Sequence, residues 1–182
     1  MNDIEASEIY LYDYLINKTE RYLNLLQKKY KLEKDLGIFI VDEEIKVDQT
    51  HIPITLVIRF YRNWVQILVP LLPLDCITEE KKVTFYELLL SLNNEFADTE
   101  FELDKNLGLI MISNEMHIDG YVYDVFEEEY NAILVVIQEL VRKARNILPN
   151  IAEVLDKGIQ RWLKKYTEPF KQLKEGPFEA FT

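Results

Sequence analysis

The sequence predicts an α+β fold in the order helix, three antiparallel strands, helix, two-stranded hairpin, helix, with an added C-terminal helix. Apolar residues recur at helical spacing in four segments, and β-branched and aromatic residues gather in the segments between them. The breaks between successive strands are too short for the crossover of about a dozen residues that a parallel pair requires. The 182 residues divide into an α+β domain over 1–148 and a basic amphipathic helix and tail over 149–182.

The first helix is expected from about Asp3 to Leu36. No proline or glycine interrupts this stretch until Gly37, a residue type that commonly ends helices. Its apolar residues recur at threes, fours and sevens, with lysine and glutamate between them: Ile4, Leu11, Leu15, Tyr22, Leu25, Leu26 and Leu32.

Three strands follow, at 38–47, 52–60 and 64–72, separated by the short polar breaks "DQTH" and "YRN". This close spacing favours antiparallel hairpins. Because proline cannot donate a hydrogen bond to a neighbouring strand, Pro70 predicts that the third strand, "WVQILVPLL", is either an edge or bulged.

A second helix is expected to start at Thr78, where a capping hydroxyl precedes two glutamates, and to run to Asn93 and Asn94. The stretch "FELDKNLGLIMISNEM" (101–116) then has two apolar segments around a polar turn, which is typical of a hairpin.

This hairpin has one alternative, a calcium loop. Asp104, Asn106 and Glu115 fall at positions 1, 3 and 12 of the twelve-residue EF-hand pattern. That pattern also needs an oxygen ligand at position 5 and glycine at 6, where this chain has Gly108 and Leu109. The pattern therefore indicates a turn and no calcium site.

The third helix is expected from Tyr121 or Asp124 to about Leu148, with glutamates in its first turns and basic residues in its last, as the helix dipole favours. After Pro149, a further helix is expected to continue until Pro169. Its apolar stripe consists of Ile151, Leu155, Ile159, Trp162 and Tyr166.

The net charge of −11 argues against nucleic acid and anionic membrane surfaces as partners, because both attract lysine and arginine. The charge is uneven: residues 75–130 carry a net −12 and residues 131–182 a net +3. The basic terminal helix could therefore lie across the acidic region, in the same chain or in a second subunit.

The sequence has few residues of the types that usually carry out catalysis. We therefore predict no enzyme, no cofactor, and no catalytic or metal-binding residue. Met116, His117 and Asp119 form only a weak ligand pattern, and consecutive glutamates at 127–129 point in different directions on a helix. Cys76 has no visible source of thiolate activation. A single cysteine and an N-terminus without the apolar core of a signal peptide predict a reducing, cytoplasmic location.

The stretch "LLLSLNNEF", running straight into "FELDKNLGLIMIS", resembles the YbjN-like family and the class I type III secretion chaperones. The resemblance covers roughly residues 5–148, with a leucine-rich "LN" stretch at Leu88–Asn94 and a hairpin at Phe101–Ser113. It implies a two-layer α+β fold and a homodimer that binds an extended segment of another protein without chemistry. The helix and tail after Pro149 depart from it.

The leading prediction is thus a homodimeric, chaperone-like protein-interaction module. The partner-binding residues are predicted on one face of the third strand: Trp64, Gln66, Leu68 and Pro70. Two alternatives stay open: a regulatory adaptor of a transcription or signalling system that docks through its C-terminal helix, and an enzyme of unrecognised type.

Overall fold

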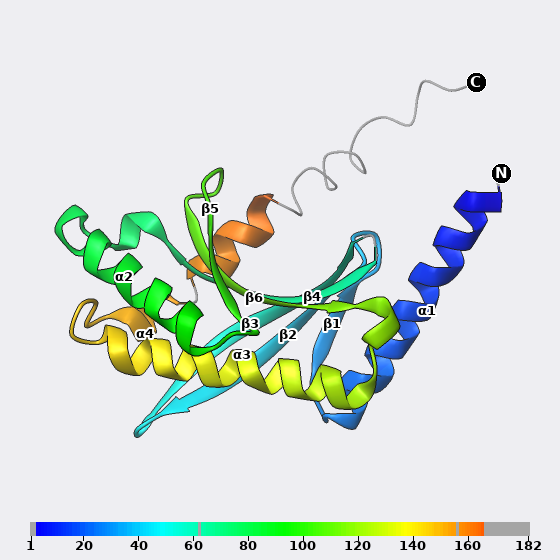
Figure 1. Ribbon diagram of the computed structural model, residues 1–182, viewed down its shortest axis with the longest axis horizontal. Coiled ribbons are helices and arrows are strands. Elements are labelled where there is room, and N and C mark those ends of the chain that lie inside the picture. Colours follow the sequence, from blue (N-terminus) through cyan, green and yellow to red (C-terminus); the bar gives the residue numbers. More distant parts are fainter. Residues whose placement is uncertain (1–2, 62, 156, 166–182) are drawn as a thin grey trace.

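The computed structural model describes residues 3–61, 63–155 and 157–165, and it shows one antiparallel sheet of six strands in the order β1-β2-β3-β4-β6-β5 (Figure 1). The strands are β1 Tyr30–Glu33, β2 Ile38–Val47, β3 Thr50–Tyr61, β4 Trp64–Pro73, β5 Glu100–Asp104 and β6 Leu109–His117. The helices are α1 Asp3–Leu25, α2 Glu79–Glu95, α3 Tyr123–Ala144 and α4 Ile151–Val154, with single 3-10 turns at Leu74–Cys76 and Ile118–Gly120. The predicted α+β class is confirmed, and the predicted elements occur in the predicted order, with one further strand, β1, between the first helix and the three predicted strands.

The expectation of one helix to Leu36 is wrong, because α1 ends at Leu25 and β1 follows. The chain leaves the helix through Gln27, whose φ of 57° lies in the left-handed region. Tyr30 then packs edge-on against Phe39 of the neighbouring strand, with ring centroids 5.5 Å apart. Gly37, at φ 58°, forms the turn between β1 and β2 and does not end a helix.

One face of the sheet carries the main core, under α1, α2 and α3. Odd-numbered residues of β4, such as Val65 and Ile67, face this core together with Phe85 of α2 and Leu23 of α1. The helix α3 contributes most to it, through Phe126, Tyr130, Ile133, Val136, Ile137, Leu140, Val141 and Ala144. Three helices therefore share a single apolar sheet face (Figure 1).

The opposite face carries a smaller core under a helical segment, 157–165. Ile159 and Trp162 of this segment are buried against a cluster of sheet residues: Ile38, Val57, Leu68 and Leu109. Gly158 lies so close to β4 that a Cβ there would be 2.3 Å from the carbonyl oxygen of Pro70. The segment can therefore approach the sheet only because residue 158 has no side chain.

The prediction that β4 is an edge is wrong, because β4 pairs with β3 on one side and β6 on the other. The alternative prediction from Pro70, a bulge, is confirmed, because the register with β6 shifts between Pro70 and Leu72. Pro70 itself pairs with Met111, and the extra residue of the bulge is Leu71. The ladder with β3 has already ended at Leu68, and the nitrogen of Pro70 is directed to that side, so the proline costs the sheet no ladder bond.

The C-terminal stripe is buried, although its helix is interrupted. Ile151 and Leu155 join the main core and Ile159 and Trp162 the smaller one, whereas Tyr166 lies outside the described residues. The division into 1–148 and 149–182 stays a prediction. Among the helices described here, none is long and apolar enough to cross a membrane.

Candidate functional site

The β5–β6 hairpin closes through a turn that uses the side chain of Asp104. Its Oδ1 accepts hydrogen bonds from the backbone N–H groups of Asn106 at 2.8 Å and Leu107 at 2.9 Å. Gly108 follows at φ 57°, a conformation that glycine adopts at no steric cost. The carboxylate that would open a calcium loop is thus part of the turn, as the sequence predicts.

The strand β5 is shorter than β6 and covers only half of its outer side. Their register runs from Asp104 opposite Leu109 to Glu100 opposite Ser113. Beyond this point residues 114–117 of β6 pair with β4 only, within the part of the chain that the structure describes. The sheet therefore has an open edge along the last residues of β6.

The hydrogen-bond phase shows which backbone groups this edge presents. The N–H of Ile118 donates to the carbonyl of Asn63 at 2.9 Å, one step beyond the pair of His117 with Trp64. In an antiparallel pair, successive residues direct their backbone groups alternately toward and away from the partner. The backbone N–H and C=O groups of Glu115 and the N–H of His117 therefore point outward, away from β4, whereas the C=O of His117 faces the 3-10 turn Ile118–Gly120 that it caps.

A hydrogen-bonded side chain beside β5 agrees with this alternation of backbone groups. The same alternation directs the backbone groups of Phe101 away from β6. There Asn93 of α2 meets them: its Oδ1 accepts the N–H of Phe101 at 2.7 Å and its Nδ2 donates to the carbonyl at 3.2 Å. Asn93 thus takes the place of a neighbouring strand at this position. Among the described residues, no side chain does the same for Glu115 or for the N–H of His117.

An acidic cleft of about 340 Å³ lies at the open edge. The start of β5, the middle of β6 and α3 enclose it, and five of its seven lining residues are carboxylic acids. The lining residues are Asp98, Glu100, Glu102, Ser113, Asn114, Glu115 and Glu129.

Asn114 and Glu129 join β6 to α3 at the inner wall of this cleft. The Nδ2 of Asn114 donates to the backbone carbonyl of Glu129 at 3.1 Å and to its Oε2 at 2.5 Å. Burial raises the pKa of the Glu129 carboxyl; the hydrogen bond from Asn114 opposes this rise, and the charges of Asp98 and Glu128 add to it. The Oδ1 of Asn114 is buried and has no hydrogen-bond partner among the described residues.

A polar row on the sheet surface leads away from the cleft. The Nε of Arg59 donates to the Oε1 of Gln66 at 2.6 Å, and the Nε2 of Gln66 donates to the Oε1 of Glu115 at 2.9 Å. The hydroxyl of Tyr61 donates to the same Glu115 oxygen, and burial followed by this bond raises the pKa of Tyr61 to about 12. Glu115 is therefore held in place by two neighbouring strands.

The four residues predicted to bind a partner share one face of β4, but they differ in exposure. Trp64 is 38% exposed and packs edge-on against His117 at the end of β6, with ring centroids 5.1 Å apart. Gln66 is buried within the polar row. Leu68 and Pro70 are buried, and the segment 157–165 packs against both positions. Only Trp64 and Gln66 therefore lie beside the open edge.

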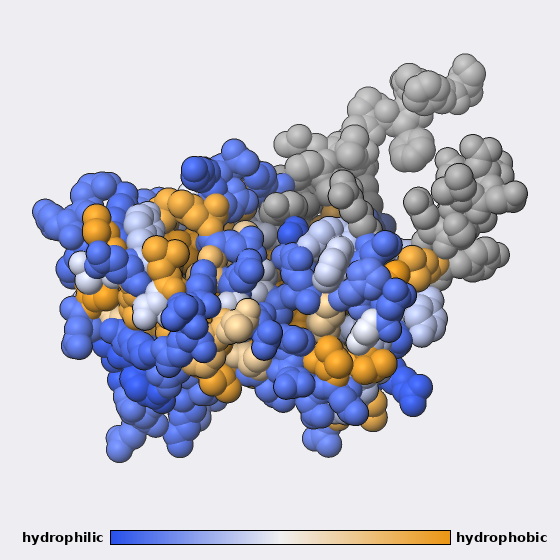
Figure 2. Space-filling model, viewed as in Figure 1, coloured by the Kyte–Doolittle hydropathy of each residue, from blue (hydrophilic) through white to orange (hydrophobic). Residues whose placement is uncertain are grey.

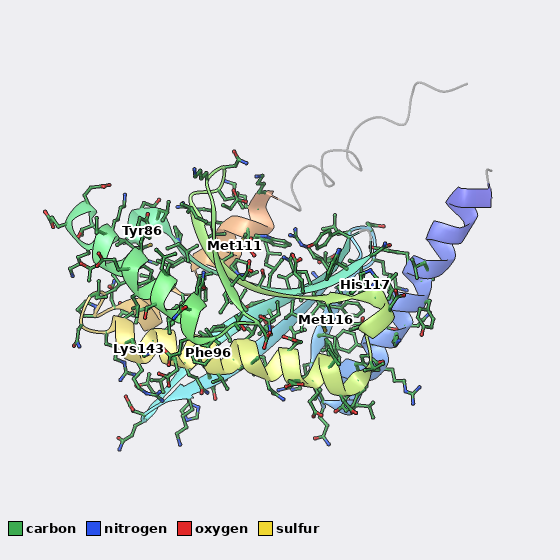
Figure 3. The ribbon with its side chains drawn as sticks, in the orientation of Figure 1. Tyr86, Phe96, Met111, Met116, His117 and Lys143 are labelled. Carbon is green, nitrogen blue, oxygen red and sulfur yellow. The ribbon has the colours of Figure 1, made fainter. Side chains whose placement is uncertain are left out.

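The weak ligand patterns do not come together as a site. Met116 is buried in the main core, while the Nδ1 of His117 lies 3.4 Å from a carboxylate oxygen of Asp119 (Figure 3). Glu127 accepts a hydrogen bond from the Tyr123 hydroxyl at 3.2 Å, away from the cleft that Glu129 lines. Across the described residues, no three histidine, cysteine or acidic side chains are placed to hold a metal ion.

A second hollow, of about 220 Å³, lies between α2 and β5 and is mainly apolar. It is lined by Tyr86, Leu89, Leu90, Asn93, Phe101, Glu102, Leu103 and Ile110. Leu90 is 67% exposed and Leu103 is 41% exposed at its rim. Apolar side chains gather in this region of the surface, around α2 (Figure 2).

Sequence reasoning missed the cleft as a unit, although one signal pointed to it. The excess of acids at 75–130 includes every carboxylate of the cleft. What the sequence lacked was the strand order, which places β6 between β4 and β5 and brings Glu129 against Asn114.

No protein-family model matches the sequence, and no curated protein matches it. Among solved structures, one similar chain is YbjN, a proposed transcription regulator from E. coli, with a TM-score of 0.53 and 11% identity over 72% of this chain and 91% of that one. The ExsC–ExsE complex matches with a TM-score of 0.47 and 14% identity, over 76% of this chain and 96% of that one. The HopA1–SchA chaperone–effector complex matches with a TM-score of 0.45 and 15% identity, over 69% and 91%.

Proposed function

We propose that this chain, which has a YbjN-like fold, is a non-enzymatic protein-interaction module that acts as a homodimer and binds an extended segment of a partner protein. The segment adds as a strand to the open edge of β6. A reducing cytoplasm is the expected compartment, since the chain has a single cysteine.

The observation that carries this proposal is the set of outward-facing backbone groups on β6, namely the N–H and C=O of Glu115 and the N–H of His117. A sheet edge that presents unpaired N–H and C=O groups is a template for another strand, and main-chain bonds to it supply affinity without chemistry. The chain covers the corresponding position on β5 with Asn93, yet leaves β6 open for four residues. Trp64, beside His117, offers an aromatic surface for a side chain of the added strand.

The homodimer is assigned to the apolar hollow between α2 and β5. Its rim exposes Leu90 and Leu103, and Val83 of the same helix is 65% exposed. Grouped exposed apolar side chains of this kind usually mark an interface between proteins. A second copy at α2 and β5 leaves the end of β6 free, because the two surfaces lie on different parts of the hairpin.

The regulatory adaptor that docks through its C-terminal helix receives less support. Ile159 and Trp162, the residues that such a helix would present, are buried against the sheet. They would have to leave the smaller core before they could contact a partner.

A proline at residue 117 tests strand addition. His117 has φ −68° and ψ 140°, which proline can adopt, and its N–H points outward. His117→Pro therefore removes one outward donor while keeping the strand, and His117→Ala removes the same imidazole while keeping the donor. Both variants and the parent are immobilised, and the proteins that each captures from native lysate are compared by mass spectrometry.

We expect the parent and His117→Ala to capture the same proteins and His117→Pro to lose them. Equal capture by the proline variant would show that partners bind elsewhere. An absence of any specific capture by the parent would count against the interaction module itself.

A further inference from the structure

We infer that the acidic cleft at the open edge of β6 seats a lysine or arginine side chain of the added strand, so that the partner segment is basic. This inference rests on the proposed strand addition and names the chemistry of the segment. It concerns the cleft, which shares Glu115 with the polar row and no residue with the hairpin turn.

The first argument is the charge of the cleft. Asp98 and Glu100 are exposed, and neither makes an ion pair within the described ranges. Glu102 accepts a hydrogen bond from Ser113, and Glu115 accepts from Gln66 and Tyr61, so their partners among the described residues are neutral. Carboxylates gathered without a cation repel one another, and an added cation relieves this repulsion.

The second argument is the unsatisfied oxygen of Asn114. This side chain is 2% exposed, it lines the cleft, and its Oδ1 has no donor among the described residues. A buried acceptor without a donor costs about 1–3 kcal/mol, so native structures rarely leave one open. An ammonium or guanidinium group brings several donors at once and bonds the carboxylates of the cleft first. The Asn114 oxygen is itself buried, so it gains a donor from the cation only when its side chain turns toward the cleft.

The third argument is the position of the cleft relative to the edge. Glu115 contributes a carboxylate to the cleft and outward backbone groups to the edge. A strand that pairs with Glu115 therefore runs past the mouth of the cleft. Side chains of a strand alternate between its faces, so one cationic side chain can enter while its neighbours point away.

The shape of the site favours a long organic cation over a metal ion. The carboxylates come from β5, β6 and α3, and no three of the described acidic side chains are placed to hold a metal. A volume of about 340 Å³ also exceeds what one ion needs. Lysine and arginine carry their charge at the end of a flexible stem and can reach across such a space.

The test uses three fluorescein-labelled peptides of nine residues, in which lysine, glutamine or glutamate alternates with valine and threonine. Binding to the full chain is followed by fluorescence anisotropy at low and high salt. The cleft variant is Asp98→Asn/Glu100→Gln. The matched control is Asp13→Asn/Glu153→Gln, which removes the same charge from exposed positions of α1 and α4, away from the cleft and from the proposed dimer surface.

We expect the parent to bind the lysine peptide more tightly than the glutamine peptide, and the glutamate peptide least. The cleft variant should lose about three- to tenfold of its affinity for the lysine peptide, as expected for two exposed ion pairs, whereas the control should keep it. High salt should reduce the preference for lysine. The side-chain amide signal of Asn114 in NMR spectra should shift with the lysine peptide and stay in place with the glutamine peptide.

Two other outcomes are informative. If the lysine and glutamine peptides bind equally and His117→Pro weakens the binding of both, the segment still adds to the edge of β6. The inference that the cleft binds a lysine or arginine side chain is then wrong. If no peptide binds the parent, or if His117→Pro leaves the peptide affinities unchanged, both inferences are wrong: strand addition at this edge and the binding of a cationic side chain in the cleft.

Discussion

The side-chain amide of Asn93 bonds both backbone groups of Phe101, accepting from its N–H at 2.7 Å and donating to its carbonyl at 3.2 Å. A residue of α2 thereby closes one position of the outer edge of β5. Since exposed strand edges invite pairing with other chains, this bond closes the outer edge of β5 to such pairing at Phe101.

Replacing this amide should destabilise the protein. Asn93→Ala leaves the N–H and C=O of Phe101 without partners in a half-buried place, at a cost of about 1–3 kcal/mol. For a chain of this size each kcal/mol lowers the Tm by about 2–4 °C. Asn94→Ala is the control, because Asn94 is exposed on the same helix. Equal melting temperatures for the two variants in calorimetry would show that the bond adds no stability.

A methyl group at residue 158 should displace the segment 157–165. The added Cβ would lie 2.3 Å and 2.4 Å from the carbonyl oxygens of Pro70 and Leu71, which belong to backbone and cannot rotate away. Gly158→Ala should therefore lower the free energy of unfolding by about 1–3 kcal/mol. It should also shift tryptophan emission to the red, since Trp162 is only 2% exposed. Gly120→Ala, which meets nothing within 4 Å, is the control; an unchanged spectrum in both would contradict this packing.

The proposed dimer can be dissociated with a charge on α2. Light scattering on a sizing column should give the parent about twice the chain mass of 21.7 kDa. Leu90→Glu places a carboxylate in the apolar hollow and should give the mass of one chain. Val122→Glu changes an exposed valine outside this hollow and should leave the dimer intact. A monomeric parent would remove the dimer from the proposal.

The half-buried carboxyl of Glu129 should make stability depend on pH. Burial raises its pKa in the folded chain, so the folded state holds this proton more tightly than the unfolded state. The stabilisation is present below the unfolded pKa and is lost as pH rises through the folded pKa. Glu129→Gln keeps the shape without ionising, so its stability relative to the parent should increase between about pH 4 and pH 7. Urea unfolding across this range measures the trend, and Glu128→Gln, on the exposed side, should not reproduce it.

Local features of the fold could be predicted from the sequence, because single residues determine them. Asp104 and Gly108 form the hairpin turn by a hydrogen bond and a positive φ. The strand β1 was missed because Tyr30 and Leu32 also continue the helical spacing of α1. Pro70 predicted an irregularity, but only the strand order distinguishes a bulge in a central strand from an edge.

The candidate site was less predictable, since it is assembled from distant segments. Asp98, Asn114 and Glu129 meet only after β6 has paired with β4 and α3 has packed on the sheet. The same pairing placed Leu68 and Pro70 beneath the segment 157–165, although alternation correctly grouped them with Trp64 and Gln66.

The short reach of β5 also limits how long a complex can last. Residues 114–117 present roughly 13 Å of open strand, at about 3.3 Å per residue. So short a strand can form only a few main-chain bonds, and a small contact dissociates quickly because affinity differences lie mostly in the dissociation rate. A segment bound as proposed would therefore be released quickly, and the residue at which the chain enters β5 would set its residence time, because that residue fixes how much of β6 stays open.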